Sequence, residues 1–179
     1  MAMAISVPRY TLADLERFPD DGSRYELLDG VLIVTPSPAW QHQNVVTGLW
    51  LKLRLACPAD MIAFVAPLDV VYGDLTVLQP DVLVVRRADL GERTVAGPPV
   101  LAVEVLSPST RHLDLAYKRA RYEEAGCPSY WVIDPLRPSI VCWDLVDGVY
   151  EEVARATGDE QVTLQRPYPV TLAPAELVA

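Results

Sequence analysis

The stretch that decides the fold class spans residues 100–134 and has the sequence VLAVEVLSPSTRHLDLAYKRARYEEAGCPSYWVID. It begins with an apolar run typical of a buried strand and ends with a second one, SYWVID. Between them the pattern predicts a helix of about three turns, with Ser109 or Thr110 as N-cap and Gly126 as C-terminal stop. A strand, a helix and a strand in succession favour an α/β fold.

The rest of the chain supports the same class. Helices are expected at 10–19 and 40–56, and strands at 25–34, 61–67, 68–73, 81–85, 139–145, 149–155 and 161–164. Two Asp-Gly pairs, at 29–30 and 147–148, predict hairpin turns. We therefore predict a mixed sheet flanked by helices, with a β-rich C-terminal tail, in a single domain spanning residues 1–179.

Composition narrows the class of protein. The chain has 179 residues, of which 51% are hydrophobic and 22% charged, which fits one globular domain. The start, MAMAISVPRYTL, lacks the pattern of a signal peptide, and no apolar run approaches the length of about 20 residues that crosses a membrane. Three cysteines without CxxC spacing argue against a disulfide framework and structural zinc. We therefore expect a cytoplasmic protein without membrane contact.

The net charge of −9 weighs against avid binding of nucleic acid through phosphate contacts alone. One segment, RHLDLAYKRAR at 111–121, departs from the acidic average because it has four basic side chains against Asp114. The segment predicts either a solvated helix face or a surface that faces phosphate. Its basic side chains are those of Arg111, Lys118, Arg119 and Arg121.

Two acids stand in apolar strand patterns. Asp81 opens the strand in LQPDVLVV (78–85), and Glu104 lies late in VLAVEVL (100–106). If these strands are antiparallel neighbours, the two carboxylates come together, and their repulsion favours a bound cation. Oxygen ligands alone indicate Mg²⁺ or Mn²⁺ rather than zinc. The alternatives are an acid at a strand mouth for Asp81 and an acid paired with a basic residue for Glu104.

The pair Pro80-Asp81, followed after 22 residues by Glu104, resembles the PD-(D/E)XK nuclease superfamily. Residues 24–43 and 98–135 are similar to one branch, the Uma-two family of putative restriction endonucleases. The resemblance implies a restriction-endonuclease-like fold, Mg²⁺ held by Asp81 and Glu104, and hydrolysis of DNA phosphodiester bonds. Cutting of both strands needs two active sites, so the resemblance also makes a homodimer an expectation.

The superfamily has a lysine two residues after the second acid, where this chain has Leu106. The Uma-two branch places its lysine in the following helix, and Lys118 matches that position. The resemblance therefore implies that Lys118 orients the attacking water or stabilises the developing charge. The alternative is an ordinary ion pair with Asp114, four residues earlier on the same helix.

Two further positions match the branch. The resemblance implies a supporting role for Glu26 and for His42, whereas the alternatives are an exposed strand acid and a structural histidine. Cys127 and Ser129 depart from the branch, which usually has valine and glutamate there, and these changes concern local packing or a loop contact.

Three functions are consistent with the sequence. The first is a magnesium-dependent DNA endonuclease. The second is a catalytically silent nuclease-like scaffold that binds protein or nucleic acid, which the acidic charge and Leu106 favour. The third is a β-rich domain that binds a small molecule, for which the pairing of Asp81 with Glu104 would be a coincidence.

Overall fold

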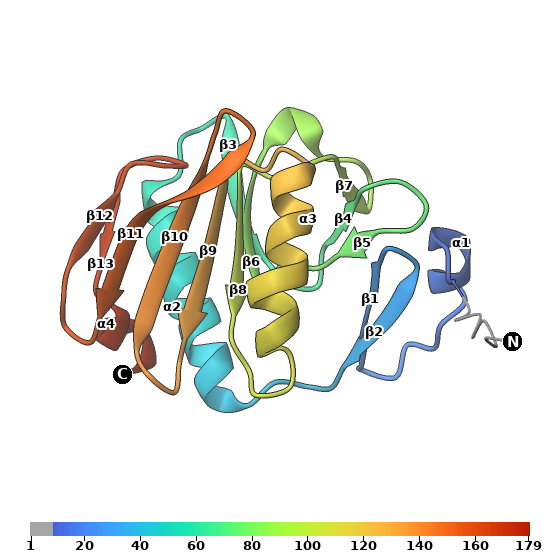
Figure 1. Cartoon of the computed structure of the whole chain (residues 1–179), viewed down its shortest axis with the longest axis horizontal. Coiled ribbons are helices and arrows are strands. Elements are labelled where there is room, and N and C mark those ends of the chain that lie inside the picture. The colour runs from blue at the N-terminus through green and yellow to red at the C-terminus, as the bar shows by residue number, and fades with distance from the viewer. Residues whose placement is uncertain (1–8) are drawn as a thin grey trace, which may run out of the picture.

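A six-stranded mixed sheet forms the centre of the computed structural model, which describes residues 9–179. Its strands lie in the order β11-β10-β9-β8-β6-β3 (Figure 1). All neighbours run antiparallel except β8 and β9, which are parallel. The strands are β3 (Met61–Val65), β6 (Val82–Arg86), β8 (Leu101–Val105), β9 (Ser129–Asp134), β10 (Ser139–Val146) and β11 (Val149–Thr157).

A helical crossover joins the parallel strands β8 and β9, as a parallel pair requires. Its two main parts are the π-helical segment η2 (Leu113–Lys118) and the α-helix α3 (Arg119–Glu124). At its start the Ser107 hydroxyl accepts the backbone N–H of Thr110 (3.2 Å), so the capping side chain is Ser107 and not Ser109 or Thr110 as expected. Gly126, with φ of 79°, ends the helix as predicted.

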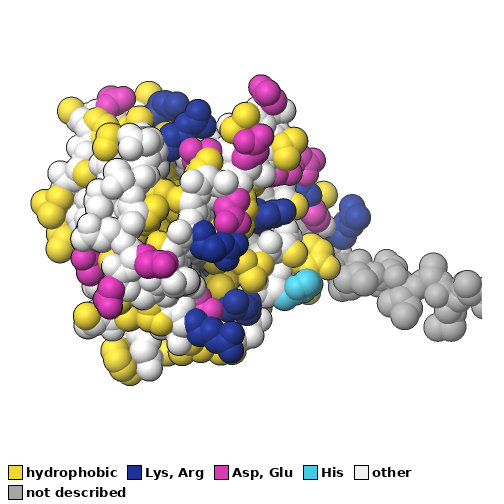
Figure 2. Space-filling model, turned by 60° about the vertical axis from the view of Figure 1, so that its left-hand side comes forward, with side chains coloured by type: hydrophobic (Ala, Val, Ile, Leu, Met, Phe, Trp, Pro, Cys, Tyr) yellow, Lys and Arg dark blue, Asp and Glu magenta, His cyan; other side chains and the backbone are white. Residues whose placement is uncertain are grey.

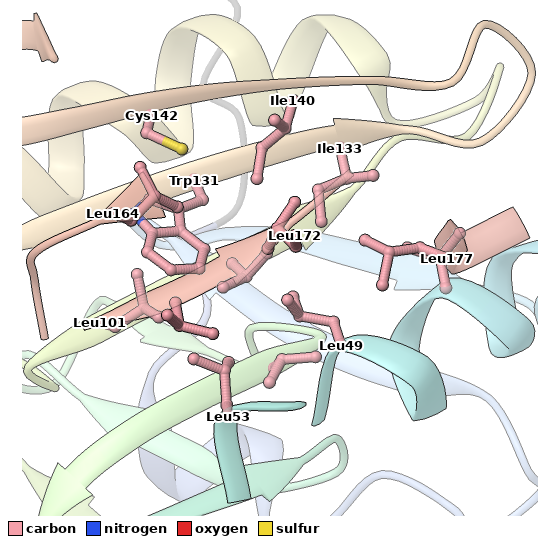
Figure 3. Close-up of a cluster of buried hydrophobic side chains, with 14 of the residues drawn as sticks. Leu49, Leu53, Leu101, Trp131, Ile133, Ile140, Cys142, Leu164, Leu172 and Leu177 are labelled. Atoms are coloured by element: carbon pink, nitrogen blue, oxygen red, sulfur yellow. The ribbon is translucent and has the colours of Figure 1, made fainter. Parts of the chain in front are cut away.

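The two faces of the central sheet have different partners. Helix α2 (Trp40–Ala56) covers one face, while η2 and α3 cover the other (Figure 1). On the α2 side, aliphatic side chains of the helix and the strands pack around Trp131, and the C-terminal segment completes this core (Figure 3). On β8, Leu101, Val103 and Val105 belong to this core, and Ala102 belongs to the α3 side. Alternation along the strand therefore places Glu104 on the α3 side.

A second sheet, with the order β2-β1-β5-β4-β7, lies beside the first (Figure 1). Val70 and Val95 of this sheet pack against Leu83 and Val85 of β6. The predicted Asp-Gly turns are confirmed, since both residues have positive φ at 29–30 (55° and 81°) and at 147–148 (50° and 85°). The strands are β1 (Arg24–Leu28), β2 (Val31–Thr35), β4 (Asp69–Val71), β5 (Val77–Leu78) and β7 (Thr94–Ala96).

Five short elements complete the described part of the chain: α1 (Leu12–Leu15), the 3-10 helix η1 (Arg87–Asp89), β12 (Val162–Leu164), β13 (Val170–Leu172) and α4 (Pro174–Val178). Helix α1 begins after Thr11, which caps it as predicted, but it is shorter than the expected 10–19. No helix among the described residues is long and apolar enough to cross a membrane. The expectation that a signal peptide is absent concerns the start of the chain, where residues 1–8 lie outside the described residues.

Candidate active site

Asp81 and Glu104 lie at the same end of neighbouring strands. Asp81 directly precedes β6, which pairs antiparallel with β8 as predicted, with Val82 opposite Val103. Continuing this register by one residue sets Asp81 opposite Glu104. The strand order and register therefore bring the two acids together from positions far apart in the sequence.

The Asp81 carboxylate is buried (3% exposed) and surrounded by donors. Its Oδ1 accepts a hydrogen bond from Arg24 Nη1 (2.6 Å), and its Oδ2 accepts one from the backbone N–H of Val105 (2.8 Å) and contacts His42 Nε2 (3.2 Å). Burial raises the pKa of Asp81, but the hydrogen bond to His42 and the charge of Arg24 outweigh burial and lower the pKa to about 2. Asp81 is therefore ionised at neutral pH.

The Glu104 carboxyl group has fewer donors. Its Oε1 contacts Lys118 Nζ (3.1 Å) and the Tyr122 hydroxyl (3.4 Å), and the residue is 1% exposed. Burial raises the pKa of Glu104 well above its usual value, and the charge of Lys118 compensates this only in part. Glu104 therefore needs either a proton or additional positive charge nearby.

Lys118 reaches these acids from η2, on the sheet-facing side of the helix, and is 1% exposed. Its Nζ lies 2.9 and 3.1 Å from the two carboxylate oxygens of Glu26, 3.1 Å from Glu104 Oε1 and 3.7 Å from Asp114 Oδ1. Burial lowers the pKa of Lys118, but the charges of Glu104 and Glu26 outweigh burial and raise it above its usual value. Lys118 is therefore a buried cation shared by three acids, and we call these four residues the Lys118 cluster.

The π-helical form of η2 is part of this arrangement. Asp114 (2% exposed) and Lys118 are its two buried residues, while Ala116 and Tyr117 between them are exposed. The Tyr130 hydroxyl donates to the Asp114 backbone carbonyl (2.8 Å) and so ties η2 to β9. Wide π-type turns inside helices occur frequently at functional sites.

Glu26 is buried at 0% exposure, so the alternative of an exposed strand acid is wrong. Besides Lys118, its Oε1 accepts the backbone N–H of Gln79 (2.8 Å). Glu26 belongs to β1, and the second sheet therefore contributes an acid to a cluster whose other members come from β8 and η2. A supporting role for Glu26 in catalysis stays a prediction.

A cleft of about 1020 Å³ opens along one side of this cluster. Asp81, Arg24 and His42 line it, and so does Leu106, which occupies the position of the superfamily's lysine. The members of the Lys118 cluster are not among the lining residues, because they lie buried behind this wall. The site thus has a solvent-facing part at Asp81 and an enclosed part at Lys118.

The basic segment 111–121 is largely neutralised within the protein. Arg111 pairs with Asp134 (2.6 Å), and Arg121 pairs with Asp29 and Glu124. Arg119 points away from the Lys118 cluster and lies over the ring of Trp143, 5.4 Å from its centroid. Figure 2 shows basic side chains in separate groups, interspersed with acidic ones, on the face in view. These contacts favour a solvated helix face over a free phosphate-binding surface.

The carboxylate oxygens at this site are the type of ligand that Mg²⁺ and Mn²⁺ prefer. The site has more acidic than basic side chains, which favours an added cation. Its two permanent cations are Arg24 and Lys118, and its four acids are Asp81, Glu104, Glu26 and Asp114. Within residues 9–179 no group of three or more His, Cys, Asp or Glu side chains is arranged to hold a metal ion. Mg²⁺ is usually bound through one or two carboxylates, with water and phosphate completing its shell, so two carboxylates such as those of Asp81 and Glu104 would be enough to hold it.

Sequence reasoning missed Arg24, which contacts both Asp81 and Glu26. The available signal was its position two residues before Glu26, which places both charged side chains on one face of β1.

Cys127 and Ser129, the two departures from the Uma-two branch, make local contacts. Cys127 Sγ lies 3.3 Å from the Pro99 carbonyl oxygen, and Ser129 Oγ donates to Asp144 (2.6 Å).

Comparison with protein families identifies the chain's relatives. Residues 12–175 match the Uma2 family, described as a putative restriction endonuclease. The chain belongs to this family. The crystal structure of a putative nuclease belonging to DUF820 from Anabaena variabilis ATCC 29413 superposes with a TM-score of 0.74 at 19% identity, over 94% of this chain and 97% of that one. A comparison with curated proteins found no match.

These relatives confirm the predicted family and the nuclease-like α/β fold. At 19% identity the structural likeness shows the fold alone. Uma2 membership supports a nuclease function in general terms, and with it a nucleic-acid substrate.

Proposed function

We propose that this Uma2 protein is a Mg²⁺- or Mn²⁺-dependent endonuclease that hydrolyses DNA phosphodiester bonds. The observation that carries the proposal is the position of Asp81 on the cleft wall, opposite Glu104, with the Lys118 ammonium 3.1 Å from Glu104. One domain spanning residues 1–179, a homodimer with two sites and a cytoplasmic location belong to the same proposal.

Asp81 and Glu104 would hold the divalent cation, which when bound polarises the scissile phosphate and lowers the pKa of a water molecule. The Val105 N–H and His42 fix the orientation of the Asp81 carboxylate. Glu26 and Asp114 hold the Lys118 ammonium beside Glu104, so its charge is in place before substrate arrives. Such preorganised charge stabilises the negative charge that develops on phosphate oxygens.

Lys118 thus takes over the positive charge that the superfamily places two residues after the second acid. Leu106 at that position lines the cleft and offers no charge. In this proposal Lys118 is the catalytic cation, and Glu26 and His42 are positioning residues because each acts through another side chain of the site.

A silent interaction scaffold is the second candidate, and a specific observation favours it. Both oxygens of Asp81 already accept hydrogen bonds, and Lys118 is already surrounded by three carboxylates. A network whose members already satisfy one another also stabilises the packing of the second sheet against the central sheet. The scaffold predicts a stable fold that neither binds the cation nor cleaves DNA.

Incubation of supercoiled plasmid with the protein and Mg²⁺ separates the two candidates. The endonuclease should convert plasmid to open-circular and linear forms, and Glu104→Gln should abolish this conversion. Glu92→Gln is the matched control, since Glu92 is exposed and makes no ion pair among the described residues. Equal cleavage by the wild type and Glu104→Gln would assign the activity to a contaminant and support the scaffold.

A further inference from the structure

Arg24 occupies the place beside Asp81 that a cation would need. Its Nη1 lies 2.6 Å from Asp81 Oδ1 and 3.2 Å from the Gln79 carbonyl oxygen. A divalent cation on Asp81 would repel the guanidinium at this distance. Binding of the cation therefore requires Arg24 to move, and its side chain, 18% exposed and lining the cleft, has room to do so.

Arg24 also has a donor that no group among residues 9–179 accepts. Its Nε is buried and makes no hydrogen bond within the described residues, because Glu26 Oε2 lies 3.5 Å away in an ion pair only. Thr35 stands directly opposite Arg24 in the β1–β2 hairpin, so both side chains share one face. The Thr35 hydroxyl is likewise buried and has no hydrogen-bond partner in the described part of the chain, and Thr35 also lines the cleft.

Buried polar atoms are normally satisfied, so two neighbouring unpaired donors at one cleft indicate a missing acceptor. Cleft-lining residues carry most of the unpaired buried side-chain atoms that the described chain has. A guanidinium beside a hydroxyl suits an anion with several oxygen acceptors, and phosphate fits this description. Lys118 is not part of this position, since it is 1% exposed and lies behind the cleft wall rather than beside Arg24 and Thr35.

We propose that Arg24 and Thr35 form the position that binds the phosphate of the DNA substrate, and that Arg24 is held on Asp81 until a divalent cation displaces it. The inference rests on the proposed function and adds a phosphate-binding pair to it. It couples the two ligands, because the cation that takes Asp81 releases Arg24 to the substrate. Arg24 then donates to the phosphate from its terminal guanidinium nitrogens and from its Nε.

Two measurements test the pair in the full-length protein: binding of Mn²⁺ alone, and binding of a short fluorescent DNA duplex with Ca²⁺ in place of Mg²⁺. Thr35→Val should weaken DNA binding about tenfold, as expected for one hydrogen bond to a charged group, and leave Mn²⁺ affinity unchanged. Arg24→Met should weaken DNA binding about a hundredfold and strengthen Mn²⁺ binding, because Asp81 loses its competing cation.

Thr47→Val is the matched control. Thr47 also lines the cleft, but its hydroxyl already donates to the Gln43 carbonyl (2.9 Å), so this substitution should change neither affinity. If Thr35→Val binds DNA as well as Thr47→Val does, or if Arg24→Met weakens Mn²⁺ binding, the inference is wrong. Thr35→Val keeps the test decisive should Arg24→Met fail to fold. A wild-type protein that binds no Mn²⁺ would instead overturn the proposed function itself.

Discussion

The two faces of the central sheet use the same strands for different purposes. On the α2 face, β6 and β8 present Val82, Val84, Leu101 and Val103, all 0% exposed and packed against aliphatic helix residues. On the opposite face the same sheet carries Glu104 beside the buried ammonium of Lys118. One face therefore stabilises the fold by apolar burial, while the other holds charge at a cost in desolvation.

The difference shows how a small chain can keep charges buried. Lys118 on η2 pairs with acids from two other elements, Glu26 on β1 and Glu104 on β8, as well as with Asp114 on η2 itself. Replacing one member should therefore disturb several elements at once, whereas trimming the apolar face should act on stability alone. Substitutions on each face test this division.

The largest effect is expected for Lys118→Ala. Loss of one oriented charge at a reacting centre should lower the cleavage rate by about 10²–10³-fold, as a quenched plasmid assay would measure. Three buried carboxylates would also lose their cation, so the metal-free protein should lose about 3–5 kcal/mol of unfolding free energy in a denaturant titration. Lys118→Arg should not restore the activity fully, because a planar guanidinium does not replace a compact ammonium.

Lys52→Ala is the control for this substitution. Lys52 pairs with Glu176 at 2.8 Å near the surface, so its loss should change stability little and cleavage not at all. A Lys118→Ala protein that cleaves DNA as fast as Lys52→Ala would show that Lys118 is only structural.

A smaller effect, on stability alone, is expected for Leu49→Ala on the apolar face. Leu49 is 0% exposed within the core beneath α2, and the cavity should lower the unfolding free energy by about 3 kcal/mol. Mn²⁺ affinity of the folded protein should equal that of the wild type in a calorimetric titration. A clear loss of Mn²⁺ affinity would mean that the two faces are coupled.

The smallest effect is expected for Glu104→Gln without metal. Burial raises the pKa of Glu104, so the folded protein keeps this proton to a higher pH than the unfolded chain does. Its contribution to stability is therefore full below the usual glutamate pKa and is lost as pH rises through the folded pKa. Glutamine resembles the protonated acid, so melts should show the variant gaining stability relative to wild type as pH rises. A variant that melts far below wild type at neutral pH would make Glu104 a structural ion-pair partner.

Local patterns were sufficient to predict much of the fold. The apolar runs at 81–85 and 100–106 and the Asp-Gly turns became β6, β8 and two hairpins, because alternation and turn chemistry act over a few residues. Strands β5 and β7 escaped prediction, since runs of two or three residues show no periodicity. The π-helical form of η2, in which Asp114 and Lys118 are buried, has no local signature in the sequence.

The candidate site was predictable only in part. Asp81 and Glu104 stand out as acids in apolar strands, and Lys118 is indicated by the resemblance to the Uma-two branch. The structure brings the three residues to one place, although their catalytic roles stay predictions. The sequence around Arg24 shows only a basic residue at the start of a strand and does not indicate a contact with Asp81. Its contact with Asp81 depends on how the second sheet lies against the first, and this long-range packing cannot be derived from the residues around Arg24.

Titration with Mn²⁺, followed by the loss of the free-ion signal in electron paramagnetic resonance, tests the central claim most directly. The wild-type protein should bind one Mn²⁺ per chain, Glu104→Gln should lose this binding, and Glu92→Gln should keep it, because Asp81 and Glu104 are the proposed ligands. Equal binding by all three proteins, or no binding by the wild type, would contradict the account.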